Sequence, residues 1–171
     1  MGVAVCLVVR LLVPLLIFRR PLLGGVLSIV ADFADLVFFN IWGWPEWDYQ
    51  SFDKVLDVYY LTIEVIVAQR FERLPRVVAS ALFAYRLVGV AIFEVTGARQ
   101  VLMAFPNLFE LWFLFVVAVA RFRPGYQLTG RRTAAWLLVL LVAKLIHEYV
   151  LHVAKALDDI VLFDLVRDWW P

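Results

Sequence analysis

Residues 22–42 read LLGGVLSIVADFADLVFFNIW, an apolar run interrupted by two acidic side chains, Asp32 and Asp35. A helix of about 20 residues extends for about 30 Å, which is the thickness of the hydrocarbon core of a membrane. The run is apolar on every face and not along one stripe, as is typical of helices surrounded by lipid and by other helices. This stretch therefore predicts a transmembrane α-helix.

Similar runs recur along the whole 171-residue chain, which is 64% hydrophobic and has a mean hydropathy of +0.87. Soluble domains are nearer half apolar. The breaks between the runs combine proline, glycine and charge, as loops between helices do. We predict an all-α, polytopic membrane bundle that forms a single transmembrane domain over residues 1–171. Its six spans are expected at 3–18, 22–42, 52–72, 76–97, 100–120 and 132–156, followed by an interfacial tail at 157–171.

The first run, VAVCLVVRLLVPLLIF, carries Arg10 in its middle and ends in two arginines. A signal peptide would place its charge before the apolar region and end in small residues, so we predict a retained helix. Pro14 keeps a kinked or in-plane segment open as an alternative.

Arginine is concentrated in alternate loops of the predicted bundle. Because positive residues favour the cytoplasmic side, we predict a plasma-membrane protein with both termini on the non-cytoplasmic side. The opposite side carries only Arg99 and Arg167. The loops after the first, third and fifth spans carry Arg19, Arg20, Arg70, Arg73, Arg76, Arg121, Arg123, Arg131 and Arg132.

Polar side chains inside the predicted spans are the candidate functional residues. An ionisable group costs about 2.5–3.5 kcal/mol in the membrane interior, and such groups mark ion pathways and substrate sites. Buried charged pairs that only fix helix register are the structural alternative. The predicted ion, proton or substrate-binding residues are Asp32, Asp35, Asp57, Glu64, Arg86, Asn107, Glu110, Lys144, Glu148 and His152.

Helical spacing divides most of these residues into seams, because side chains three or four positions apart share a face. We expect the seams to converge on one polar cavity, in which Arg86 and Lys144 balance the carboxylates. The three seams are Asp32 with Asp35; Asp53, Asp57, Tyr60 and Glu64; and Lys144, Glu148 and His152.

The string HEYVLH at 147–152 is not the zinc motif HExxH, because Leu151 stands where the second histidine would be. Glu148 and His152 are candidates for a metal site completed by Asp32, Asp35 or Asp57, with manganese, iron or zinc as the metal. No cofactor is predicted, and a divalent metal is the alternative. The net charge of +1 does not indicate nucleic-acid binding.

The two halves of the chain carry similar strings in the same order, which predicts a three-plus-three inverted repeat of the kind found in transporters. The pairs are RLLVPLLIF from Arg10 with RLVGVAIF from Arg86, DFADLVFF from Asp32 with NLFELWFL from Asn107, and KVLDVYYL from Lys54 with KLIHEYVL from Lys144.

Three functions are consistent with these patterns. The preferred one is a small membrane transport protein whose mid-membrane carboxylates bind a cation or proton and couple it to a small solute. The first alternative is a membrane-embedded enzyme, metal-dependent in one version, that acts on a lipid or isoprenoid head group. The second is an accessory subunit of a larger membrane complex. A homodimer is a further expectation, because six short helices barely enclose a pathway.

Overall fold

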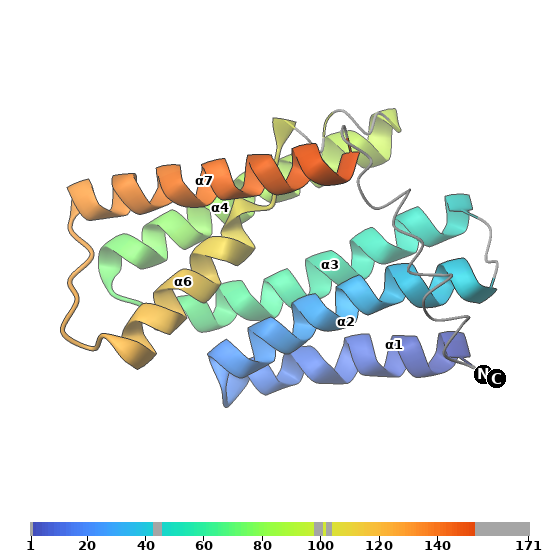
Figure 1. The fold of residues 1–171 in the computed structure, drawn as a ribbon, viewed down its shortest axis with the longest axis horizontal. Coiled ribbons are helices and arrows are strands. Elements are labelled where there is room, and N and C mark those ends of the chain that lie inside the picture. The colour runs from blue at the N-terminus through green and yellow to red at the C-terminus, as the bar shows by residue number, and fades with distance from the viewer. Residues whose placement is uncertain (1, 43–45, 98–100, 102–103, 153–171) are drawn as a thin grey trace.

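The computed structural model describes residues 2–42, 46–97, 101 and 104–152, and the side chains of 5–32, 34, 54–97, 101 and 104–146. The described residues are helical, as predicted, and they contain no strand (Figure 1). The predicted tail at 157–171 lies outside them. The helices are α1 (Gly2–Leu12), the 3-10 helix η1 (Val13–Phe18), α2 (Pro21–Trp42), α3 (Glu46–Ala68), α4 (Arg73–Thr96), α6 (Leu108–Phe122) and α7 (Gly130–His152).

The first predicted span is helical over its whole length, but its helix type changes at Val13. Pro14 stands in the first turn of η1. Proline has no N–H to donate, and its ring crowds the preceding turn of an α-helix, so the chain continues with tighter 3-10 turns. The proline therefore changes the winding of the segment without ending it.

Two predicted helix boundaries are wrong. The fifth span was expected over 100–120, whereas residues 105–107 are not helical and α6 begins at Leu108. Pro106 and Asn107 explain this start, since proline disfavours a helical residue before it and Asn107 caps the new helix. The third span was expected to begin at residue 52, whereas α3 already begins at Glu46.

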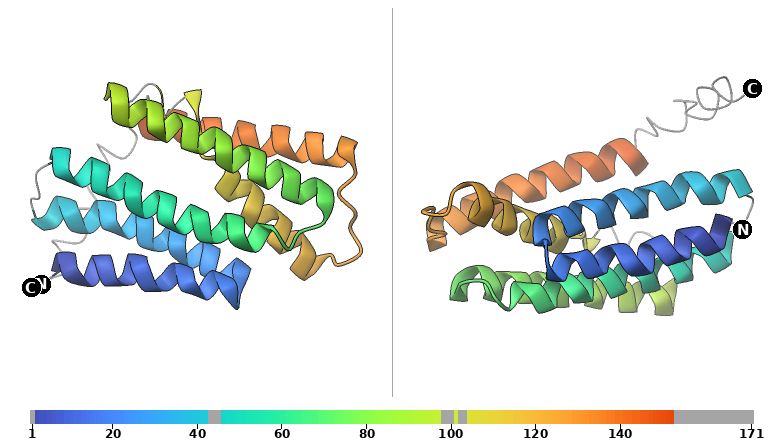
Figure 2. Two further views of the ribbon diagram at one scale, coloured as in Figure 1. Left: turned by 180° about the vertical axis from the view of Figure 1, so that it is seen from behind. Right: turned by 90° about the horizontal axis from the view of Figure 1, so that it is seen from below.

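The helices form two groups of three that follow one another in the chain. The first group is α1 with η1, α2 and α3, and the second is α4, α6 and α7; both groups can be followed in Figures 1 and 2. The turns from η1 to α2, from α3 to α4 and from α6 to α7 lie toward the left end of Figure 1. These are the arginine-bearing loops, so the fold brings their charge to one end of the bundle.

Two central helices, α3 and α6, connect the groups. α3 contacts η1, α2, α4 and α6, whereas α6 contacts α2, α3, α4 and α7. The buried face of α6 follows a spacing of three and four residues through Phe109, Trp112, Phe113 and Val116. This spacing places the four side chains on one side of a helix, against the core. The indole of Trp112 also donates a hydrogen bond of 3.1 Å to the carbonyl of Pro75 in α4.

The outer faces of the bundle are apolar and exposed within the single chain. Large hydrophobic side chains are exposed on α1, α2, α4 and α7. On α7 they include Leu138, Val139, Val142, Leu145 and Ile146. Among the described residues one helix, Arg73–Thr96, is long and apolar enough to cross a membrane, a criterion that core helices of soluble proteins also meet. The six-span arrangement therefore stays a prediction.

Candidate functional site

The polar stripe of α3 points into the bundle. Asp57, Tyr60 and Glu64 are separated by three and four residues, so they lie on one face of the helix. All three side chains are buried, and Glu64 has no exposed surface. The three side chains have different environments. Asp57 belongs to an ion-pair cluster, whereas Glu64 forms a carboxyl pair with Glu110 of α6, to which Tyr60 is hydrogen-bonded.

Glu64 is the least compensated of these groups. Neither of its carboxylate oxygens has a hydrogen-bond partner among the described residues. Gly25 of α2 leaves room for the carboxylate, because a Cβ added at this glycine would lie 3.3 Å from Glu64 Oε1. The same Cβ would lie 3.6 Å from the ring of Phe113 on α6. Glu64 therefore occupies a tight space between α2, α3 and α6 with apolar groups beside it.

Glu110 of α6 forms the second half of the carboxyl pair. Its Oε1 accepts a hydrogen bond of 2.7 Å from the hydroxyl of Tyr60, and its Oε2 accepts one of 3.0 Å from the amide of Asn107. The backbone N–H of Glu110 in turn donates to Oδ1 of Asn107, which is the N-cap of α6. An acidic residue in the first turn of a helix is favoured by the helix dipole. Glu110 also interacts electrostatically with Glu64.

Two cations from the second group of helices act on Glu110. Arg86 of α4 and Lys144 of α7 both contribute to the electrostatic environment of its carboxylate. Arg86 is buried, and its Nη1 donates a hydrogen bond of 2.8 Å to the carbonyl of Phe105. Its Nε has no hydrogen-bond partner among the described residues. Arg86 thus holds the non-helical segment before α6 while carrying a buried positive charge.

A glycine on α4 permits this contact. Gly89 is buried one turn from Arg86, and a Cβ added there would lie 2.7 Å from Cγ of Phe105. The segment before α6 therefore approaches α4 closely only because residue 89 has no side chain. Tyr85, on the same helix, donates its hydroxyl to the carbonyl of Ala104. Side chains of α4 thus bind backbone carbonyls that no helix satisfies.

The first group of helices contains a separate ion-pair cluster. Arg10 of α1 is buried, and its Nη2 lies 2.5 Å from Oδ1 of Asp32 and 2.9 Å from Oδ1 of Asp57. Lys54 completes the cluster, with its Nζ 3.1 Å from Oδ2 of Asp57. Among the described side chains, two cations and two carboxylates therefore pair with one another here. Asp32 and Asp57, both predicted binding residues, are neutralised by cations of the chain itself.

Three predicted site residues lie outside the described side chains: Asp35, Glu148 and His152. Glu148 and His152 belong to α7 by their backbone, and nothing further is described of them. Within the part of the chain whose side chains are described, no group of three metal-binding side chains is present. The seam residues with described side chains lie in two places: Asp32 and Asp57 in the Arg10 cluster, and Tyr60, Glu64 and Lys144 near Glu110.

Arg10 was not among the predicted site residues. The signal that could have found it was already visible, because Arg10 and Arg86 open the matching strings of the two halves. Gly25 gave no sequence signal for its role beside Glu64, since it only adjoins Gly24, which lies four positions before Ser28 in a spacing that suggests close helix packing.

No protein-family model, curated protein or solved structure matches the chain.

Proposed function

We propose that the chain is an integral membrane protein of the plasma membrane that binds a proton or a small cation at Glu64 and Glu110 and transports it, coupled to a small solute. The observation that carries this proposal is Glu64, whose carboxylate is fully buried with neither oxygen hydrogen-bonded in the described part of the chain. An unpaired buried charge of this kind costs several kcal/mol. A bound proton or cation removes that cost.

The surface of the bundle supports the membrane location. Exposed apolar side chains cover α1, α2, α4 and α7, whereas a soluble monomer rarely exposes apolar patches larger than a few hundred Å². Charged residues of these helices, such as Arg10 and Arg86, are turned inward. This distribution is the one expected for helices in lipid.

The contrast between the two polar places supports Glu64 and Glu110 as the ion-binding pair. In the cluster of Arg10, Asp32, Asp57 and Lys54, each carboxylate forms an ion pair with a cation of the chain. Glu64, by comparison, has no hydrogen-bond partner for either carboxylate oxygen in the described part of the chain, whereas the carboxylate of Glu110 accepts hydrogen bonds from Tyr60 and Asn107.

Arg86 and Lys144 support coupling to a second event. Both act on Glu110 from α4 and α7, so the charge state of Glu110 changes the electrostatic attraction that holds these helices to α6. A coupled transporter needs such a link between ion occupancy and helix position. The predicted inverted repeat adds to this proposal, since each half would then contribute an arginine, an acidic group and a lysine from its three successive helices.

The decisive experiment is proton flux into liposomes that contain the purified protein and a trapped pH-sensitive dye, with a membrane potential imposed by potassium and valinomycin. We expect the wild type to acidify the lumen and Glu64→Gln to abolish this flux. Glu94→Gln is the matched control, because Glu94 lies on α4 and is exposed. The same liposomes would be tested in parallel with a sodium gradient. The comparison distinguishes transport of a proton from transport of a metal cation.

A second measurement addresses the site without relying on flux. If Glu64 carries a proton, the infrared spectrum should contain a carbonyl stretch of a protonated carboxylic acid that Glu64→Gln removes. Wild-type liposomes without flux of either ion, or a Glu64→Gln variant as active as the wild type, would overturn the proposal. Absence of flux with a stoichiometric co-purifying partner would favour the accessory-subunit alternative instead.

A further inference from the structure

We propose that a basic, aromatic pocket at the start of the α6–α7 loop binds the phosphate-bearing head group of an anionic phospholipid. The pocket has a volume of about 490 Å³ and is lined by Val119, Arg123, Gly125, Tyr126 and Trp136. Its lining does not include Glu64 or Glu110, and the proposed transport does not use it. Lipid binding at this pocket depends on the membrane location in the proposed function and not on transport.

The aromatic walls of the pocket are held in place by specific contacts. The indole of Trp136 donates a hydrogen bond of 3.0 Å to the hydroxyl of Tyr126, and its ring packs against Phe115 with centroids 4.7 Å apart. The guanidinium of Arg132 lies 4.9 Å from the centre of the Tyr126 ring. Such pre-organisation lowers the entropic cost of binding a ligand.

The loop backbone is ordered by its own hydrogen bonds. The N–H of Tyr126 donates to the carbonyl of Arg123, which closes a turn at Gly125, and Nη1 of Arg132 donates to the carbonyl of Gln127. Gly125 lines the pocket without a side chain, and a Cβ added there would meet no described atom within 4 Å.

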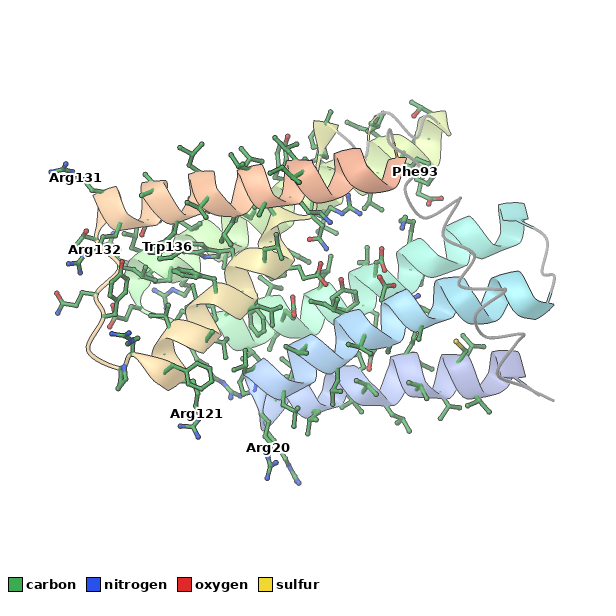
Figure 3. All side chains as sticks on the ribbon, in the orientation of Figure 1. Arg20, Phe93, Arg121, Arg131, Arg132 and Trp136 are labelled. Carbon is green, nitrogen blue, oxygen red and sulfur yellow. The ribbon has the colours of Figure 1, made fainter. Side chains whose placement is uncertain are left out.

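The charge of the segment matches a phosphate. Residues 121–132 read RFRPGYQLTGRR, with four arginines and no acidic residue. Figure 3 shows Arg121, Arg131 and Arg132 with Trp136 toward the same end of the bundle as Arg20. Arginine forms paired, charge-assisted hydrogen bonds with phosphate oxygens. Arg123 is exposed and lines the pocket, so its guanidinium is the natural contact for the phosphate.

The expected membrane position selects a lipid as the source of that phosphate. Positive loops favour the cytoplasmic side, where anionic lipids create a negative surface potential. Tyr126 and Trp136 are each 36% exposed, and tyrosine and tryptophan are enriched at the level of the head groups. Val119 and the indole offer an apolar wall that an acyl chain can follow below the head group.

The test is native mass spectrometry of the purified protein in a neutral detergent, with phosphatidylglycerol and phosphatidylcholine added at equal concentrations. We expect phosphatidylglycerol adducts to dominate and Arg123→Gln to weaken them about tenfold, as the loss of one charge-assisted contact would do. Arg20→Gln removes the same charge at the same end but outside the pocket, and should change the adducts less than twofold.

Further arms separate the outcomes. Trp136→Leu should also weaken the adducts, because it removes both the aromatic wall and the hydrogen bond to Tyr126. Inorganic phosphate at millimolar concentration should not displace the lipid; displacement would indicate a soluble phosphate ligand and overturn the proposal. Equal binding of both lipids, or equal losses in Arg123→Gln and Arg20→Gln, would overturn it too. Proton flux is measured separately, so either proposal can fail alone.

Discussion

Replacing Gly24 by alanine is expected to destabilise the protein by separating η1 from α2. A Cβ at this position would lie 2.8 Å from Cα of Ile17 and would also crowd the backbone nitrogen of that residue. Ile17 is fully buried in the core, so it has no free space into which to move. Overpacking of a core costs about 1–3 kcal/mol, and the upper end applies here because backbone atoms cannot rotate away.

An opposing effect reduces this cost. Alanine is favoured over glycine in a helix by about 1 kcal/mol, so the net loss for Gly24→Ala should be about 2 kcal/mol. For a chain of this size the apparent melting temperature would fall by about 4–8 °C. The assay is thermal unfolding in mild detergent, followed by far-ultraviolet circular dichroism with wild type and variant at the same protein and detergent concentrations.

The matched control is Gly130→Ala at the start of α7. A Cβ at Gly130 would meet nothing within 4 Å, so only the helix preference remains, and the variant should gain about 0.5–1 kcal/mol. The reasoning would be refuted if Gly24→Ala were as stable as the wild type or shifted in the same direction as Gly130→Ala.

Three further substitutions test other contacts. Arg10→Gln should lower the free energy of unfolding by about 3 kcal/mol, because it removes the Arg10 cation from the partly buried carboxylates of Asp32 and Asp57. Arg20→Gln, at an exposed position, should change the unfolding midpoint by less than 1 °C. Gly89→Ala should displace Phe105 and expose the segment before α6, so hydrogen exchange of its backbone amides should become faster while those of α3 remain protected. Trp112→Phe loses one buried hydrogen bond and some packing, and should cost about 1–3 kcal/mol in the same melts; no change would show that the indole N–H is not needed.

The helical class and most helix positions could be predicted from the chain alone. Long apolar runs bounded by proline, glycine and arginine depend on local chemistry, and α2 over Pro21–Trp42 agrees closely with the predicted span at 22–42. The fifth span was misplaced because an apolar run continues through 101–105 although the helix is restarted by Pro106 and Asn107. A hydropathy pattern does not detect a helix N-cap such as Asn107 within an apolar run.

The polar face of α3 was also foreseeable. Asp57, Tyr60 and Glu64 share a face by spacing alone, and the predicted membrane location implied burial of that face, because carboxylates exposed to lipid are costly. What each carboxylate meets was not foreseeable. Asp57 contacts Arg10, 47 positions earlier in the chain, whereas the carboxylate of Glu64 lies beside Gly25, which has no side chain.

The apolar runs that predicted the helices also predict which side chains face the interior, because helix formation and the buried face of a helix both depend on residues three or four positions apart. They cannot say which inward groups will neutralise each other. The choice of partner depends on helix packing, which brings residues distant in sequence to within about 3 Å of each other. At such distances, a shift of one helix by one turn would replace one partner with another. Only the tertiary structure pairs Asp32 and Asp57 with Arg10 and leaves Glu64 as the uncompensated carboxylate on which the proposed function depends.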